Sequence, residues 1–342
     1  MTTTDDTTAH SEAPVSTSMR AVVQQGYGSA DVLAVRTIGR PHISPSQVLL
    51  EVHAAGIDRG VWHLMTGLPL VGRAVFGLRK PKQPVAGLDV AGRVVAVGAD
   101  VTRLKPGDEV FGVAIGSFAE YAAAEEHKLS LKPASITWER AGVTAISGLT
   151  ALQALTEVAD VQAGQHVLVL GASGGVGTYT VQIAKALGAE VTGVCSAAKA
   201  DLVRSLGADH VLDYRTDDFA DGSYAYDVII DVGGMSPLRR LRRALTARGT
   251  LVIVGGESEA RFTGGVGRQG RAMLLSPFVS QRLTSFLSKE GHATIDKLAG
   301  LLDSGALVPA IDRVVTLDEV AAAIQDLEDG KVRGKVAVRV RR

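Results

Sequence analysis

Apolar and polar residues follow two different patterns along this chain, with the change near residue 135. From residue 19 to about residue 131, short apolar runs are separated by turn residues such as Lys105-Pro106-Gly107-Asp108. These runs predict strands at 21–24, 48–55, 90–97 and 118–123. The first part of the chain is therefore expected to form a small β-rich domain, in the manner of a partly open barrel.

Beyond residue 135 strands alternate with helices. Ser135 and Glu139 stand at capping-box positions, so a helical stretch is expected to start there and run to residue 155. The later pattern predicts strands at 167–170, 190–195, 210–213, 226–231, 250–254 and 336–340, and helices at 238–245, 293–302 and 317–327. Such alternation is typical of an α/β fold with a Rossmann-type, doubly wound parallel sheet and right-handed crossovers.

The segment 256–271 is rich in glycine and polar residues, so it is expected to be a mobile loop near the ligand. The apolar run 271–279 follows it and is expected to be an edge strand of the sheet.

The centre of the chain is a glycine-rich turn between a buried strand and a helix, in residues 166–188. Side chains at the start of the helix would keep a phosphate away from the backbone N–H groups, and a glycine further on allows helix and strand to pack closely. The residues predicted to hold a dinucleotide pyrophosphate are Ser173, Gly174, Gly175, Val176 and Gly177. The alternative is a glycine-rich loop that only turns the chain.

The end of the next strand bears on the choice of dinucleotide. An NAD site would carry a carboxylate there for the ribose 2′-OH, but this chain has Ser196 and Lys199. A hydroxyl and an ammonium can bind a 2′-phosphate, and Tyr214 can stack on adenine or donate to the same phosphate. NADPH is therefore the expected cofactor. In the alternative, Lys199 is a solvated residue at a helix start and Tyr214 packs at a strand end.

Composition narrows the class of protein. The 342 residues include 46% hydrophobic residues and have a formal net charge of zero, which gives no electrostatic case for a nucleic-acid or membrane partner. The single cysteine, Cys195, excludes an internal disulfide and a cysteine-rich zinc site. Residues 1–18 are polar and lack the basic, apolar start of a targeting signal, so we expect a disordered tail and a cytoplasmic protein.

In these motifs the chain resembles the medium-chain dehydrogenase/reductase superfamily, in its zinc-independent quinone oxidoreductase branch. The segments that carry the resemblance are 87–112, 147–155, 167–189, 194–214 and 330–340. The resemblance implies a GroES-like β-barrel catalytic domain beside the Rossmann domain, with the substrate cleft between them. The expected divisions are 1–18 (tail), 19–137 (catalytic domain), 138–272 (NADP-binding domain) and 273–342 (return to the catalytic domain).

The chain departs from the zinc-dependent members of that superfamily. Those enzymes carry a cysteine near the position of Ile57 or Asp58, and a His-Glu pair where this chain has Leu88 and Asp89. The eight histidines show no H-x-x-x-H-type spacing. No metal is expected, and hydride transfer is expected to reach an acceptor that is already electrophilic, namely a quinone or an enone.

The resemblance also assigns roles to individual residues. Asp58 replaces an amide that the family aims at nicotinamide and substrate, and it either donates a proton or pairs with Arg59 or another cation. Trp62 lines the substrate pocket or packs in the core, and Thr150 either bonds near the nicotinamide or is a structural helix residue. The residues whose contact with the cofactor is implied are Val232, Val254, Gly255, Gly256, Gly334 and Lys335.

Two other functions stay open at this point. One is an enoyl-thioester reductase, and the other is a non-catalytic NADPH-binding protein with the same fold, for which the altered segment at Asp58 is the only hint. Family members commonly pair through an edge strand of the Rossmann sheet, so a homodimer is expected.

Overall fold

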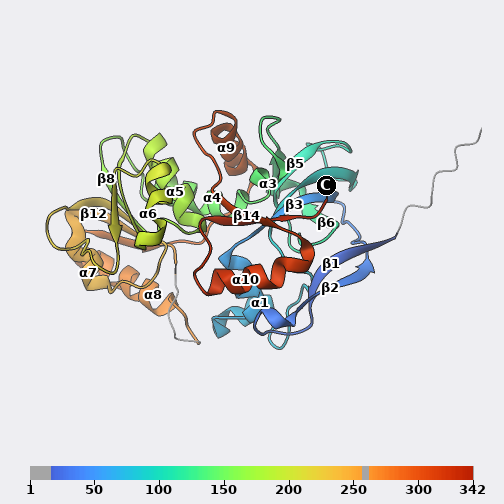
Figure 1. The fold of residues 1–342 in the computed structure, drawn as a ribbon, viewed down its shortest axis with the longest axis horizontal. Helices are drawn as coiled ribbons and strands as arrows, with labels where there is room; N and C mark the ends of the chain where they lie inside the picture. Colours follow the sequence, from blue (N-terminus) through green and yellow to red (C-terminus); the bar gives the residue numbers. More distant parts are fainter. Residues whose placement is uncertain (1–16, 256–261, 342) are drawn as a thin grey trace, which may run out of the picture.

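A computed structural model describes residues 17–255 and 262–341, and it shows two lobes side by side along the longest axis (Figure 1). The nucleotide lobe is built on a parallel sheet and the catalytic lobe on a mostly antiparallel one. The chain is therefore of the predicted class, a Rossmann-type sheet beside a GroES-like β-rich domain.

The nucleotide lobe contains a six-stranded parallel sheet. Its strands are, in spatial order, β10 (His210–Asp213), β9 (Glu190–Cys195), β8 (His166–Leu170), β11 (Tyr226–Asp231), β12 (Leu245–Ile253) and β13 (Arg282–Ser285). The central strands are buried on both faces, as their nearly continuous apolar sequences require. The order reverses between β8 and β11, which is where open α/β sheets bind ligands. The helices of this lobe are α5 (Gly175–Ala186), α6 (Ala200–Ser205), α7 (Leu238–Ala244) and α8 (Val266–Leu275).

The catalytic lobe contains a seven-stranded sheet and a separate hairpin. The sheet strands are β14 (Ile311–Val315), β15 (Lys335–Arg339), β3 (Gln47–Ile57), β4 (Asp89–Val97), β5 (Glu109–Val113) and β7 (Leu129–Leu131), with β6 (Tyr121–Glu125) also paired to β3. The hairpin is β1 (Ser18–Gln24) with β2 (Leu33–Gly39). The helices α1 (Arg59–Thr66) and α2 (Arg73–Phe76) lie between β3 and β4 in the chain.

Three helices connect or flank the lobes. The short helix α3 (Trp138–Ala141) and α4 (Ala145–Gln153) lead into the nucleotide lobe, and α9 (His292–Asp303) packs on α4. Thr137 caps α3 by accepting from the Arg140 N–H, so the helix starts later than the expected Ser135 cap. Ser135 instead donates to Asp303, and Glu139 pairs with Arg339.

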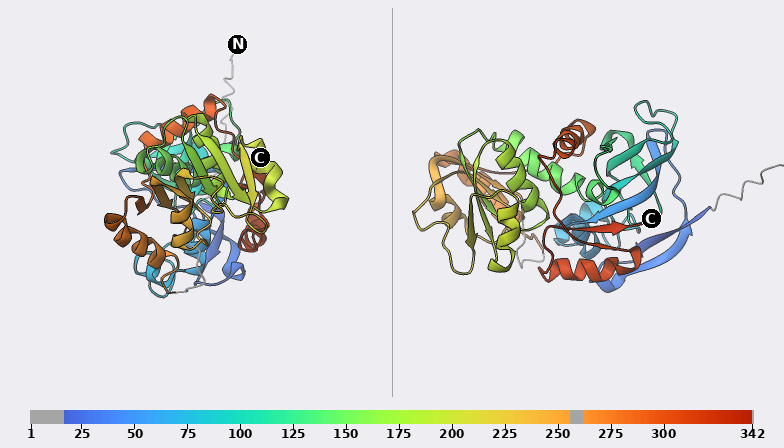
Figure 2. Two further views of the ribbon diagram at one scale, coloured as in Figure 1. Left: turned by 90° about the vertical axis from the view of Figure 1, so that its left-hand side faces the viewer. Right: turned by 45° about the horizontal axis from the view of Figure 1, so that its top comes forward.

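The end of the chain returns to the catalytic lobe. Strand β15 pairs antiparallel with β3 and parallel with β14, and α10 (Val320–Glu328) packs against α1 and β3. In the right view of Figure 2 these red segments lie in the catalytic lobe, away from the orange and yellow part of the nucleotide sheet. The pairing of Val336 with Ile57 brings the last strand next to the start of α1.

Two expectations about residues 256–279 are corrected by the structure. The described part of the expected loop contains α8, and the run 271–279 is helical rather than an edge strand. Ala272 and Leu275 pack on the sheet at helical spacing, and Pro277 has no N–H to give to a strand ladder. The edge strand is β13, which follows the expected domain boundary at residue 272 and still belongs to the nucleotide sheet. Residues 256–261, and residues 1–16 of the expected tail, lie outside the described residues.

Candidate functional site

The glycine-rich turn joins the end of β8 to the first turn of α5. Gly171 has a φ of 83°, and a Cβ at Gly177 would lie 2.1 Å from the Gly171 carbonyl oxygen, so neither position accepts another residue without distortion. A Cβ at Gly174, the N-cap of α5, would meet only that carbonyl oxygen, at 3.4 Å. The protein backbone therefore leaves no room for a side chain at Gly177. The space beside Gly174 is free of other protein atoms, as the binding of an anion at the helix start requires.

A cleft of about 610 Å³ extends from this turn along the carboxyl ends of the strands. It contains the three residues predicted to meet the adenosine end of the cofactor, namely Ser196, Lys199 and Tyr214. Tyr214 is 57% exposed, which does not fit a residue that packs at a strand end. Ser173 of the glycine-rich turn lines the same cleft. One cavity therefore joins the predicted pyrophosphate site to the predicted adenosine site.

Lys199 has partners that the sequence did not indicate. Its ammonium donates to the backbone carbonyls of Gly330 and Val332, each at 2.7 Å, and burial lowers the pKa of Lys199. The residue is therefore not a solvated helix-start lysine. Its two bonds hold the ammonium at the cleft and tie the segment before β15 to the nucleotide lobe.

The cleft also contains two arginines that sequence reasoning missed. Arg240 is held by Asp218, with Nη2 2.8 Å from Oδ1, whereas the Arg215 guanidinium lies 5.6 Å from the centre of the Tyr214 ring. Arg215 directly follows Tyr214 in the chain, so a search for further cations beside that residue would have found it.

The carboxyl ends of β11 and β12 lie next to each other, beside the switch point between β8 and β11. A Cβ at Gly255 would lie 1.9 Å from the Val232 carbonyl oxygen, so these two predicted positions are in contact, with Val254 beside them. Gly256 lies outside the described residues. Arg268 of α8 pairs with the buried Asp231 at 2.6 Å and also donates to the Gly255 carbonyl. Burial raises the pKa of Asp231, and Arg268 opposes that rise.

A buried cluster of charges joins the two lobes. The Lys335 ammonium lies 3.0 Å from Asp89 Oδ2 and 3.8 Å from Asp58 Oδ2, and it is 3.2 Å from the Ser147 hydroxyl. All four side chains are buried. The neighbouring Gly334 N–H donates to the Ser173 carbonyl at 2.9 Å, so the cluster is tied to the glycine-rich turn.

Asp89 is the most deeply buried acid of this cluster. Its Oδ1 accepts from the Ile146 N–H at 2.7 Å, and a Cβ at Gly56 would lie 2.8 Å from Oδ2. Burial raises the pKa of Asp89 to about 6, with Lys335 acting in the opposite direction. The sequence pointed to Asp58 and Lys335 separately, but to Asp89 only as a position where a zinc enzyme differs, and it did not point to Ser147.

Helix α1 presents two buried polar atoms without a hydrogen-bond partner among the described residues. Asp58 caps this helix, because its Oδ1 accepts from the Val61 N–H at 3.1 Å, while its Oδ2 has no such partner. Trp62, four residues later, has an unpartnered indole N–H. Positions i and i+4 share a helix face, so an acceptor and a donor stand together on α1. The cation paired with Asp58 is Lys335, not Arg59, which lies over the Trp62 ring at 5.1 Å.

Thr150 is occupied inside its own helix. Its hydroxyl donates to the Ile146 carbonyl at 2.8 Å and lies 3.3 Å from the Ser288 hydroxyl. These contacts are those of a structural helix residue, and a contact with nicotinamide stays a prediction.

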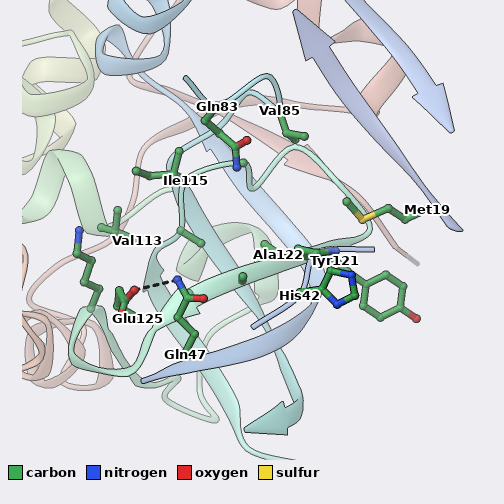
Figure 3. Close-up of a pocket in the computed structure, with 16 residues that line it drawn as sticks. Met19, His42, Gln47, Gln83, Val85, Val113, Ile115, Tyr121, Ala122 and Glu125 are labelled. Carbon is green, nitrogen blue, oxygen red and sulfur yellow. Dashed lines mark hydrogen bonds between the residues drawn. The ribbon is translucent and has the colours of Figure 1, made fainter. Parts of the chain in front are cut away.

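A second cavity, of about 440 Å³, lies in the catalytic lobe (Figure 3). Met19, His42 and Tyr121 line it, as do Gln47 and Glu125, and Gln47 donates to Glu125 at 2.8 Å. None of the predicted site residues lines this cavity.

The cluster does not fit a zinc ion. No group of three or more His, Cys, Asp and Glu side chains suited to a metal occurs in residues 17–255 and 262–341. Asp58 and Asp89, at two positions where the sequence departs from the zinc enzymes, flank the Lys335 ammonium.

Comparisons with known proteins identify the family of this chain. The model for the alcohol dehydrogenase GroES-like domain matches residues 44–134, and the model described as zinc-binding dehydrogenase matches residues 206–338. The chain is 32% identical to the 2-methylene-furan-3-one reductase of Solanum lycopersicum, over 95% of this chain and 80% of that protein. It is also 32% identical to the chloroplastic NADPH-dependent alkenal/one oxidoreductase of Arabidopsis thaliana, over 96% and 81%.

Solved structures give the same result. The quinone oxidoreductase of Coxiella burnetii superposes with a TM-score of 0.83 at 27% identity, covering 95% of this chain and all of the other. A mycobacterial protein solved in complex with NADPH superposes with a TM-score of 0.81 at 28% identity, covering 94% and 99%.

Proposed function

The chain belongs to the medium-chain dehydrogenase/reductase superfamily, in its quinone oxidoreductase branch, and on that premise we propose that it transfers hydride from NADPH to a quinone or an enone without a metal. It is an oxidoreductase that uses a nicotinamide cofactor. The proposal concerns the acceptor, the preference for NADPH and the absence of zinc.

The observation that carries this proposal is the buried cluster around Lys335. Two carboxylates flank an ammonium there, and this set of side chains supports a site without a zinc ion to polarise an alcohol or a carbonyl. Without that Lewis acid, the acceptor must itself be electrophilic, and quinones and enones meet this condition. Relatives named as a quinone oxidoreductase and an alkenal/one oxidoreductase support the same acceptor class.

Different residues of the site would bind the cofactor and the acceptor. The start of α5, with Ser173, Gly174 and Gly175, would hold the pyrophosphate, and the ends of β11 and β12 would meet the nicotinamide side. When bound, the cofactor supplies the hydride. The Trp62 N–H, which has no partner within the described chain, would donate to the carbonyl oxygen of the acceptor.

The reaction also consumes a proton. An enone that accepts hydride at its β-carbon becomes an enolate, which takes one proton to give the saturated ketone. The Asp58–Lys335–Asp89 cluster lies between the cofactor turn and α1, and it would hold that proton.

A preference for NADPH is proposed from the adenosine end of the cleft. Ser196, Lys199, Tyr214 and Arg215 line it with donors and cations, and residues 196–200, directly after β9, include no carboxylate. An arrangement of this kind favours a 2′-phosphate over a 2′-hydroxyl.

A homodimer is proposed in which β13, rather than the run 271–279, is the strand that pairs across the interface. Strand β13 pairs only with β12 within the described chain, so its outer edge is open to another strand. Large apolar side chains before and after it are exposed, namely Leu274 (75%), Phe278 (84%) and Leu287 (92%). Sedimentation at micromolar concentration tests this proposal, and a monomer would contradict it.

A cytoplasmic location is the remaining proposal, and the single cysteine supports it, since no internal disulfide can form. No helix in the described part of the chain is long and apolar enough to cross a membrane.

The experiment that tests the proposed function is a turnover assay with three acceptor classes. Oxidation of NADPH is followed with a simple quinone, a simple enone and crotonyl-CoA. Turnover of the first two supports the proposal. Preference for the thioester indicates an enoyl-thioester reductase, and binding of NADPH without turnover of any acceptor indicates a non-catalytic protein.

A further inference from the structure

The buried cluster has an excess of negative charge. It contains one ammonium, on Lys335, and two carboxylates, on Asp58 and Asp89, and each side chain is more than nine-tenths buried. Burial of an uncompensated charge is unfavourable, and a proton added to one carboxylate would make the cluster neutral. Asp58 Oδ2 has no hydrogen-bond partner among the described residues, so the cluster is incompletely paired as it stands.

The cluster is also in contact with the cofactor turn. A Cβ at Gly175, the first residue of α5, would lie 3.3 Å from Lys335 Cδ and 3.3 Å from the Ser147 hydroxyl. The lysine stem therefore lies against the helix N-terminus at which a pyrophosphate binds. Two phosphate charges at that helix start would bring further negative charge to the single ammonium of the cluster.

From this contact we propose that binding of the dinucleotide draws one proton into the Asp58–Lys335–Asp89 cluster. The inference rests on the proposed function only in that a nicotinamide dinucleotide binds at the start of α5. The Lys335 ammonium then interacts with both the Asp89 carboxylate and the pyrophosphate of the dinucleotide, so it attracts Asp89 less strongly. A proton on Asp89 compensates for this loss. Lys335 and Asp89 are positioning residues in this scheme.

The groups around Asp89 identify it as the acceptor of the proton. Among the described residues, the charged groups that act on it are Lys335 from β15 and Asp58 from the start of α1. From α4, Ile146 donates its N–H, and Ser147 contacts the lysine. From α5 the titratable group is Tyr179, which donates to the Val143 carbonyl and whose pKa is raised by burial, so it stays neutral. Burial already raises the pKa of Asp89 to about 6, close to neutral pH.

The proton balance agrees with the chemistry. One turn of enone reduction converts NADPH, the enone and one proton into NADP⁺ and the saturated ketone. One proton enters the cluster with each reduced cofactor, and each enolate consumes one proton, so the two numbers are equal. The cluster takes up the next proton when the next cofactor binds.

Isothermal titration in several buffers of different ionisation enthalpy measures the proton count directly. NADH is the main probe, because it carries the pyrophosphate but lacks the 2′-phosphate, whose own pKa near 6 would contribute protons. At neutral pH the wild type is expected to take up close to one proton per NADH, and Asp89→Asn close to none. Asp209→Asn is the matched control, since Asp209 pairs with Lys185 on the surface, and it should behave as the wild type.

A wild type that binds NADH without proton exchange overturns the inference, as does equal uptake by wild type and Asp89→Asn. If Asp89→Asn does not fold, the wild type alone decides: its affinity for NADH should fall as pH rises above about 6, by up to tenfold per pH unit. A flat profile overturns the inference. Failure of both NADH and NADPH to bind would instead refute the proposed function.

Discussion

The Lys335 ammonium and the Asp89 carboxylate lie 3.0 Å apart, although 246 positions separate them in the chain. Their contact depends on β15 pairing with β3, which in turn pairs with β4. One ion pair thus joins the end of the chain to the catalytic sheet, directly beside the cofactor turn.

Loss of the lysine charge should destabilise the fold. Lys335→Met leaves Asp58 and Asp89 buried without a cation, and removal of one partner from a buried pair costs about 3–5 kcal/mol. Urea denaturation measures the free energy of unfolding. The matched control is Lys185→Met, which breaks the more exposed pair with Asp209 and should cost about 0–1 kcal/mol. Equal losses of unfolding free energy in the two variants would show that the cluster contributes no more to stability than a surface ion pair does.

Asp89 should make stability depend on pH in a defined direction. Its pKa is raised from 3.8 to about 6 by burial, so the folded protein binds more protons than the unfolded chain between these values. The free energy of unfolding therefore falls as pH rises from about 4 to about 6, by up to about 3 kcal/mol relative to Asp89→Asn. Denaturation of both proteins across this range measures the difference. A difference that is constant with pH would contradict the raised pKa.

Two glycines of the turn should respond differently to the same substitution. Gly177→Ala would place a methyl group 2.1 Å from a backbone oxygen and should destabilise the fold, which thermal unfolding would detect. Gly174→Ala meets only that oxygen, at 3.4 Å, and should fold normally. Its methyl group would stand where the pyrophosphate approaches, so its affinity for NADPH should fall. Tight binding of NADPH by Gly174→Ala would place the phosphate elsewhere.

Cofactor choice should depend on the residues after β9. Lys199→Ala should weaken NADPH binding by about one to two decades, because a hydrogen bond to a charged group contributes about 1.5–3 kcal/mol, and it should leave NADH binding nearly unchanged. Ser196→Asp should go further, since a carboxylate repels the 2′-phosphate and accepts from the 2′-OH of NADH. Calorimetric titration of both cofactors measures the ratio. Equal weakening of both by Lys199→Ala would mean that its bonds to Gly330 and Val332 are its only role.

Local sequence signals were sufficient for the glycine-rich turn and for most strands of the nucleotide sheet. The glycine-rich turn and the strands His210–Asp213 and Tyr226–Asp231 are found as predicted, because apolar runs and turn residues are properties of neighbouring positions. Helix α8 was missed, because its glycine-rich sequence indicates a loop and only tertiary contacts of Ala272 and Leu275 favour a helix.

The buried cluster could not be predicted in the same way. Asp58, Asp89 and Lys335 come from three separate strand ends and carry no shared motif. Their proximity follows from the order of strands in the catalytic sheet, which the sequence pattern did not give. Lys199 was placed correctly beside the cleft, but its carbonyl partners belong to a segment more than a hundred residues later.

The proposed reduction of the acceptor needs no zinc. The most direct measurement is NADPH-dependent turnover of a quinone and an enone by protein purified without an affinity tag, with elemental analysis of the same sample before and after treatment with a chelator. We expect less than stoichiometric zinc and the same turnover in both samples, because the side chains around Lys335 offer no zinc ligand set within the described residues. One tightly held zinc per chain, with turnover lost on its removal and restored on its return, would contradict it.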